Sequence, residues 1–221
     1  MSYDEQDAAY DRFIDELHKD FREQALDDAE LYEKVVDDFK ASRLRAYYVQ
    51  EPVLAQPAQE ALREASDLVV AHPRAALVFA IMAAEVCLRG ALLTPLLHGA
   101  FHTEASADIL VRLVVGTKDE RLVKAFLRIL ATHTGVDLQA HRRSAASKPL
   151  WEEMHDLQVK RNLVVHQAAD VSRGDAQQAI AVAEAMLRDV FPAVITKLGL
   201  HLHEGPLICD SPKCGVVSTI G

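Results

Sequence analysis

Residues 75–82 read Ala-Ala-Leu-Val-Phe-Ala-Ile-Met and form the centre of the most apolar stretch of the chain, from Pro73 to about Leu93. Proline is favourable in the first turn of a helix, so Pro73 marks the start of one. Because this helix is hydrophobic nearly all round, other elements have to cover it, and we expect it to be the central helix of a bundle. The predicted fold class is all-α.

The rest of the chain continues the helical pattern. Only 9 Gly and 8 Pro occur in 221 residues, while Ala, Leu, Glu, Arg and Gln, which lose little on entering a helix, are abundant. Apolar spacing and capping residues predict further helices at about 4–24, 28–49, 57–71, 104–115, 117–132, 149–166 and 175–198, with Pro192 bending the last. Residues 134–148 are polar and locally basic, and a loop is expected there.

Three parts follow from this pattern. Residues 1–50 are expected to form an acidic helical extension, and the stretch from Pro52 to Pro57 looks like a linker. Residues 57–198 are expected to form the helical bundle. Residues 199–221 change character and are predicted to be a short tail, either irregular or a β-hairpin.

The net charge of −9 is unevenly distributed, because residues 1–40 hold 14 acidic and 5 basic residues and account for all of it. This argues against passive, charge-driven binding of nucleic acid, but not against an enzyme that holds a phosphate with a few placed residues. The first residues lack a signal peptide's basic region and apolar core, and no uninterrupted apolar run approaches the roughly 18 residues that cross a bilayer. Three cysteines fit a reducing compartment. We expect a cytoplasmic protein that does not associate with membranes.

The predicted helix at 149–166 contains an unusual arginine. Arg161 lies on the apolar stripe of this helix, four residues after Leu157, and a buried guanidinium is costly unless it is paired. Glu85 is the one acidic residue of the central apolar stretch, so a pair between Glu85 and Arg161 would satisfy both. In the alternative arrangement, Glu85 pairs with Arg89 on its own helix and Arg161 extends to the surface.

Asn162 and His166 are four residues apart and therefore share a helix face. On an ideal helix, Arg161 and His166 diverge by about 140°, at roughly 100° per residue. They can meet at one phosphate only if the helix unwinds near His166 or if two subunits contribute to the site.

This arrangement, Arg161-Asn162 followed by His166 at the end of a helix, resembles the Arg-x4-6-His motif of the HEPN superfamily. The polar residue after the arginine and the two valines before the histidine are typical of that family. The apolar helix from Pro73 to Leu93, with its mid-helix acid, is similar to the first core helix of the fold. The resemblance covers roughly residues 57–198.

The resemblance implies a bundle of about four or five helices that forms a homodimer, with motifs of both subunits lining one cleft. Active members are metal-independent endoribonucleases of the toxin or antiviral-defence type, so RNA is the expected substrate and no cofactor is expected. His166 would act as general acid or base, and Arg161 would hold the scissile phosphate. Asn162 would orient His166 or bind a phosphate oxygen, and Glu85 would position Arg161.

Two other readings remain open. In the first, the chain is a non-catalytic HEPN-like binding module that docks a protein or nucleotide partner, and a protein inhibitor is a further possible partner. In the second, it is a helical interaction protein in which Arg161 and Glu85 are simply a structural pair. The open cleft shared by two subunits is the feature that would separate the enzyme from the structural pair.

The tail holds four residues of the types that bind zinc, His201, His203, Cys209 and Cys214. The four residues between the two cysteines are at the loose end of the spacing in zinc knuckles, and both cysteines could simply be reduced thiols. From the sequence alone we therefore assign no metal to the chain.

Overall fold

The computed structural model describes residues 39–100, 109, 110, 113, 120–144, 146–203, 206–211 and 214. The chain divides into two compact units, Met1–Lys40 and Ala41–Gly221, and almost all described residues belong to the second. The predicted helix at 4–24, most of the one at 28–49 and nearly all of the one at 104–115 lie outside the described residues.

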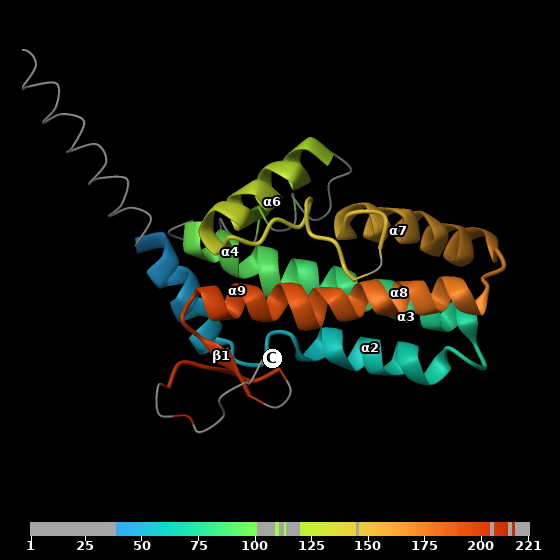
Figure 1. Ribbon diagram of the computed structural model, residues 1–221, viewed down its shortest axis with the longest axis horizontal. Coiled ribbons are helices and arrows are strands. Elements are labelled where there is room, and N and C mark those ends of the chain that lie inside the picture. The colour runs from blue at the N-terminus through green and yellow to red at the C-terminus, as the bar shows by residue number, and fades with distance from the viewer. Residues whose placement is uncertain are drawn as a thin grey trace, which may run out of the picture. The chain divides into compact units, whose positions relative to one another are not determined.

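The described residues are mostly helical, which confirms the all-α prediction (Figure 1). A helix described from residue 39 to residue 50 is followed by α2 (Gln56–Leu68), and α3 (Pro73–Val86) continues through the π-helical segment η1 (Cys87–Leu93) into α4 (Thr94–Ala100). Next come α6 (Glu120–Thr134) and α7 (Leu150–Gln167), while α8 (Arg173–Ala185) continues through the π-helical segment η2 (Met186–Val190) into α9 (Phe191–Lys197). The tail forms a small antiparallel pair of strands, β1 (His201–Leu202) and β2 (Ile208–Cys209).

Helix α3 lies at the centre of the unit, as its composition predicts, and packs against α2, α7 and α8 (Figure 1). Its buried face includes several alanines, and so do the facing surfaces of α2 and α8. Small side chains let the axes of α2, α3 and α8 approach closely, and Leu77 and Ile81 of α3 are buried beside them. The alanines concerned are Ala58, Ala61, Ala65, Ala76, Ala80, Ala83, Ala84, Ala176, Ala179 and Ala183.

The continuous helix Pro73–Gly99 is long and apolar enough, by length and composition, to cross a membrane. Arg74, Glu85 and Arg89 interrupt its apolar sequence, but its mean hydropathy stays high enough to meet that criterion. Because 61% of its most apolar window is buried inside the protein, it fits the predicted role of a central core helix.

Both long helices contain a π-helical segment, and the two segments begin side by side. The Cys87 thiol, at the start of η1, lies 3.8 Å from the Met186 carbonyl oxygen, at the start of η2. A π-segment displaces backbone carbonyls from their usual partners, and in η1 the Tyr48 hydroxyl donates to the Ala91 carbonyl at 2.6 Å. Segment η2 ends at Val190, two residues before Pro192, whose ring and missing N–H disturb the preceding turn.

Residues 41–50 of the first described helix belong to the larger unit, although their sequence continues the charged pattern of the acidic extension. Leu44 and Tyr48 are buried in the core, and the helix ends before Pro52, as predicted. Gly99 of α4 permits the close approach, since a Cβ there would lie 3.2 Å from the Leu44 Cβ. Residues 41–50 therefore belong to the same compact unit as the predicted bundle at 57–198.

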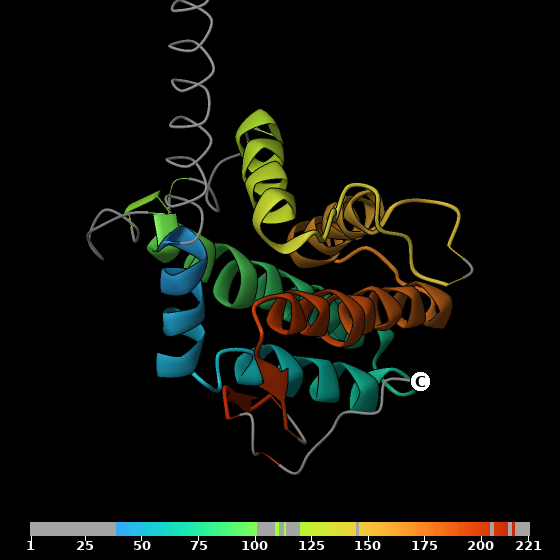
Figure 2. The same ribbon diagram turned by 60° about the vertical axis from the view of Figure 1, so that its left-hand side comes forward.

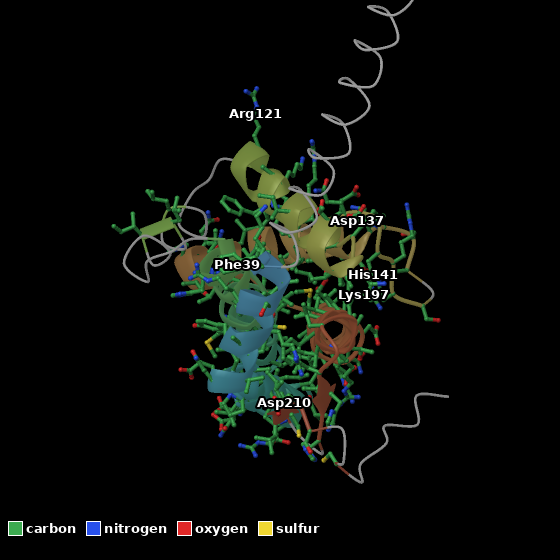
Figure 3. All side chains as sticks on the ribbon, turned by 90° about the vertical axis from the view of Figure 1, so that its left-hand side faces the viewer. Phe39, Arg121, Asp137, His141, Lys197 and Asp210 are labelled. Carbon is green, nitrogen blue, oxygen red and sulfur yellow. The ribbon has the colours of Figure 1, made fainter. Side chains whose placement is uncertain are left out.

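The hairpin and the loop before α7 lie on opposite sides of α9 (Figure 2). The hairpin is on the side of α2, where the Ile208 amide donates to the Pro52 carbonyl at 2.8 Å. Helices α6 and α7 are on the other side, joined by the predicted loop. Figure 3 labels Asp137 and His141 of that loop, and Asp210 directly after β2, on these two sides.

Candidate functional site

Helix α7 carries three of the four predicted site residues and stays helical through all of them. It starts directly after Pro149, with Glu152 and Glu153 in its first turn, where carboxylates interact favourably with the helix dipole. It continues through Gln167 and ends at Ala168, whose φ of 52° is left-handed. The helix therefore does not unwind before His166, which excludes the first of the two ways in which Arg161 and His166 could meet.

Arg161 and Glu85 form an ion pair across the contact between α7 and α3. The Arg161 Nη2 lies 2.7 Å from the Glu85 Oε1, and the two side chains are 28% and 15% exposed. This confirms the pairing predicted from the apolar surroundings of both residues. The pair is half sheltered, so the guanidinium is anchored on one side and open to solvent on the other.

Two amides complete the arrangement around this ion pair. Gln158 Nε2 donates to the Glu85 Oε1 at 3.1 Å, and Arg161 Nη1 donates to the Asn162 Oδ1 at 3.0 Å. Gln158 was not predicted as a site residue, although it lies one turn before Arg161 and so faces the same neighbour. Asn162 connects the two halves of the motif, because it contacts Arg161 and shares a helix face with His166.

His166 is exposed and lies on the face of α7 that points away from the core. The core face is formed by Leu150, Met154 and Leu157, and Arg161 lies at its edge. Since His166 is about 140° around the helix from Arg161, the structure does not bring the two side chains together within one chain. Of the two predicted ways for them to meet at one phosphate, only the contribution of two subunits is left, and it stays a prediction.

The outward face of α7 is unusually apolar for an exposed helix face. Val159 is 51% exposed and Leu163 is 40% exposed, and with His166 they follow the i, i+4, i+7 spacing of one face. Val165, on the neighbouring strip, is 53% exposed. Exposed apolar residues at helical spacing are typical of a surface that another helix covers.

Several cations near α7 are paired with acids. Arg143 makes two hydrogen bonds with the buried carboxylate of Glu153, at 2.7 and 2.8 Å. Lys148 lies 2.6 Å from Asp156. The basic character of the loop at 134–148 is therefore largely neutralised by α7 itself, which the sequence alone did not reveal.

Lys160 connects α7 to the start of α8. Its Nζ lies 2.5 Å from the Asp175 Oδ1, and Asp175 also forms a capping box with Ser172. The hydrogen bond from Lys160, together with those from Ser172, lowers the pKa of Asp175 from 3.8 to about 2. Lys160 thus has a structural partner and offers less positive charge to a ligand.

The four tail residues that could hold a metal form a second cluster at the hairpin, and Figure 1 shows the hairpin on the side of α2 and away from α7. One ligand atom from each of His201, His203, Cys209 and Cys214 lies within 4.8 Å of the others. The sequence showed the residue types but could not show that they converge, because their convergence depends on the register of β1 and β2.

Comparisons of the chain with protein-family models, with curated proteins and with solved structures found no match. The resemblance to the HEPN superfamily therefore stays a prediction that depends on the α7 motif.

Proposed function

We propose that this protein is a metal-independent endoribonuclease of HEPN type, with a toxin or defence role, that acts as a homodimer in the cytoplasm. The observation that supports this best is the arrangement on α7. Arg161 is anchored by Glu85 and Asn162, and His166 lies on an exposed apolar face of the same helix. These are an anion-binding group and a proton-transfer group on one rigid element.

Two subunits are needed because one α7 cannot turn both groups toward the same phosphate. If the faces of Val159 and Leu163 from two chains pack together, the two His166 side chains approach the same cleft. Within each chain, Arg161 lies about 7.5 Å back along the helix axis from His166 and about 140° around it, so the phosphate would be held by the Arg161 of one subunit and the His166 of the other. The apolar face then has a role that its exposure in a single chain leaves unexplained.

The reaction in this proposal is a transesterification. One His166 removes the proton from a ribose 2′-hydroxyl, and the oxygen attacks the adjacent phosphorus. The bond to the 5′-oxygen of the next nucleotide breaks, and the protonated His166 of the other subunit gives that oxygen a proton. The products are a 2′,3′-cyclic phosphate and a 5′-hydroxyl, and no metal or water takes part.

Arg161 contributes charge at the phosphate in this scheme. Its remaining N–H donors bind the non-bridging oxygens and stabilise the negative charge that grows in the transition state. Glu85 and Gln158 act as positioning residues, because they contact the guanidinium or its carboxylate partner and not the RNA.

The test compares purified wild type, His166→Ala and a matched control, His155→Ala, on mixed single-stranded RNAs in EDTA. His155 is also exposed on α7 but lies three turns before His166. We expect cyclic-phosphate ends from wild type and His155→Ala, and a loss of about 100- to 10,000-fold in rate for His166→Ala. Leu163→Glu should make the protein monomeric in sedimentation and abolish cleavage. Cleavage equal in all variants would reject the proposal.

The paired cations around α7 favour a second candidate, a non-catalytic binding module for a protein or nucleotide partner. Arg143, Lys148 and Lys160 all have carboxylate partners, so little free positive charge remains for a polyanion. In that case no RNA is cleaved above the background of His166→Ala, and Leu163→Glu instead abolishes capture of a specific partner.

A further inference from the structure

The hairpin brings four metal-binding side chains to one place. In a tetrahedral zinc site, Zn–S bonds of about 2.3 Å and Zn–N bonds of about 2.0–2.1 Å put neighbouring ligand atoms about 3.3–3.8 Å apart. The ligand atoms of His201, His203, Cys209 and Cys214 all lie within 4.8 Å of one another, and the Cys214 sulfur is 3.1 Å from the His203 Nε2. The cluster is thus close to tetrahedral dimensions.

Strand geometry explains why these residues converge. His201 and His203 are two residues apart, and His201 is directly opposite Cys209 in the antiparallel register, so all three side chains can occupy one face of the hairpin. The chain then continues past Ser211, and Cys214 completes the group. The strand register, rather than the spacing of the two cysteines, brings the ligands together. The loose cysteine spacing is therefore no argument against a zinc site.

Two polar atoms of the cluster indicate that a ligand belongs there. The His201 Nε2 is buried and has no hydrogen-bond partner within the part of the chain that the structure describes. A buried, unsatisfied nitrogen is costly, and coordination to a cation would satisfy it. In addition, the Ser211 amide donates to the Cys209 sulfur at 3.4 Å, an interaction that stabilises a thiolate and orients it.

The ligand set selects the metal. Two thiols and two imidazoles are the donors of structural zinc sites, whereas calcium and magnesium require oxygen ligands. All four residues are partly buried, and all four coordination positions would be filled by protein. A closed site of this kind stabilises structure and leaves no open position for a reacting water.

We infer that His201, His203, Cys209 and Cys214 bind one zinc ion, which holds the C-terminal hairpin in place. Strands of two residues are too short to be stable alone. The hairpin is otherwise anchored by the buried residues Leu200 and Ile208 and by the hydrogen bond from Ile208 to Pro52. The zinc ion supplies the missing cross-link, and its binding free energy becomes folding free energy of the tail.

This site also shapes a surface groove. The groove has a volume of about 1000 Å³, with Gln59 and Arg63 of α2 on one side and Leu202 and Leu207 of the hairpin on another. Because the hairpin forms that wall, zinc binding fixes the shape of the groove. The inference does not depend on the proposed ribonuclease activity, since the hairpin and α7 lie on opposite sides of the unit.

The test measures metal directly on protein made without a histidine tag and kept under reducing conditions. Wild type, Cys214→Ser and His203→Ala are incubated with zinc, separated from free metal, and analysed by mass spectrometry for zinc per chain. We expect one zinc per wild-type chain and a loss of affinity of more than about 100-fold in both variants, since changes to outer partners alone cost about 10- to 100-fold. Cobalt in place of zinc should give the visible absorption of a tetrahedral site with thiolate ligands.

Matched controls separate ligands from other residues of the same type. Cys87→Ala removes a buried thiol in the core and His155→Ala an exposed imidazole on α7, and both should keep one zinc per chain. Helical circular dichroism checks that every variant is folded. The inference is overturned if folded wild type takes up no zinc or if the tail variants bind zinc as wild type does. It is also overturned if Cys209 and Cys214 stay joined in a disulfide although the protein is kept under reducing conditions.

Discussion

The α7 site and the tail cluster are both groups of polar side chains in one unit, but they differ in how many of their polar atoms have hydrogen-bond partners within the chain. At α7, Arg161, Glu85, Gln158 and Asn162 hydrogen-bond to one another. In the tail, the His201 Nε2 is buried without a partner in the described part of the chain, and the Cys214 thiol, a weak donor, faces His203.

This difference determines what a ligand has to do at each place. Under the proposed function, an RNA phosphate would share the Arg161 guanidinium with Glu85 and would gain only the donors that this ion pair leaves over. A zinc ion in the tail replaces no existing strong interaction and satisfies atoms that are otherwise costly to bury. We therefore expect the fold to depend on a ligand at the tail and not at α7.

The largest effect that would test this comparison is zinc removal. Zinc at about 1000 times its dissociation constant stabilises the protein that binds it by about 4 kcal/mol. In a unit of this size, that corresponds to a fall of about 8–16 °C in the midpoint of thermal unfolding after chelation. The effect should reach the whole unit because Leu200 and Ile208 are buried in the common core.

The matched control is thermal unfolding of Cys214→Ser, measured with and without chelator. This variant should already melt at the temperature of the chelated wild type and should not respond further. If chelation leaves the wild-type melt unchanged, the tail is held by its apolar contacts alone and the contrast between the two regions disappears.

The next largest effect is expected at the ion pair of α7. Glu85→Ala leaves the half-sheltered Arg161 without its carboxylate, and we expect a loss of about 2 kcal/mol, between the values for exposed and fully buried pairs. Urea unfolding measures it. The double variant Glu85→Leu with Arg161→Leu should recover most of the loss, because replacing both charges by apolar groups removes the desolvation cost as well. A double variant as unstable as the single one would contradict this account of the pair.

Glu85→Gln distinguishes positioning from stability. It keeps oxygen and nitrogen atoms beside Gln158 and Arg161 and should cost less than Glu85→Ala. If Arg161 has to be held for catalysis, RNA cleavage by Glu85→Gln should fall more than its stability does.

Much of the fold follows from local pattern. The apolar run after Pro73 predicts the central helix, and proline and glycine positions predict most helix ends. Pro52 follows the helix described over 39–50, and the φ of 69° at Gly135 and Gly199 suits the ends of α6 and α9. The π-helical segments were not predicted, because they depend on tertiary partners such as the Tyr48 hydroxyl at Ala91. For the same reason, the packing of residues 41–50 in the larger unit was not predicted.

Less of the two candidate sites than of the fold could be predicted from the sequence. The Glu85–Arg161 pair could be predicted because two charges in apolar surroundings require each other. The pairing of Arg143 with Glu153 could not, since a loop residue can reach several acids and its path is set by packing. The convergence of the tail ligands depends on a strand register that four separate residues cannot reveal.

A smaller effect, with a change of sign, should come from His201→Leu. With zinc bound, the variant loses a ligand and should be less stable than wild type. Without zinc, it removes a buried nitrogen that lacks a partner, so its stability should equal or exceed that of wild type by about 1 kcal/mol. Melts in zinc and in chelator measure both signs. Destabilisation under both conditions would show that His201 is needed for packing rather than for coordination.

The smallest effect concerns Asp175, whose carboxylate has hydrogen-bond partners within the chain, as the Arg161 guanidinium does. Its pKa is lowered to about 2 in the folded protein by the hydrogen bonds from Lys160 and Ser172, so its contribution is present above the unfolded value of 3.8 and is lost as the pH falls toward 2. The free energy of unfolding of wild type should therefore exceed that of Asp175→Asn by about 1 kcal/mol or less at pH 6, and the two should converge between about pH 5 and pH 2. Lys160→Met removes the largest cause and keeps the Ser172 box, so it should show a smaller dependence over the same range. Zinc should leave the stability difference between wild type and Asp175→Asn unchanged, because Asp175 stabilises the start of α8 beside the α7 site and not the tail cluster. A zinc-dependent difference would mean that the two regions are coupled.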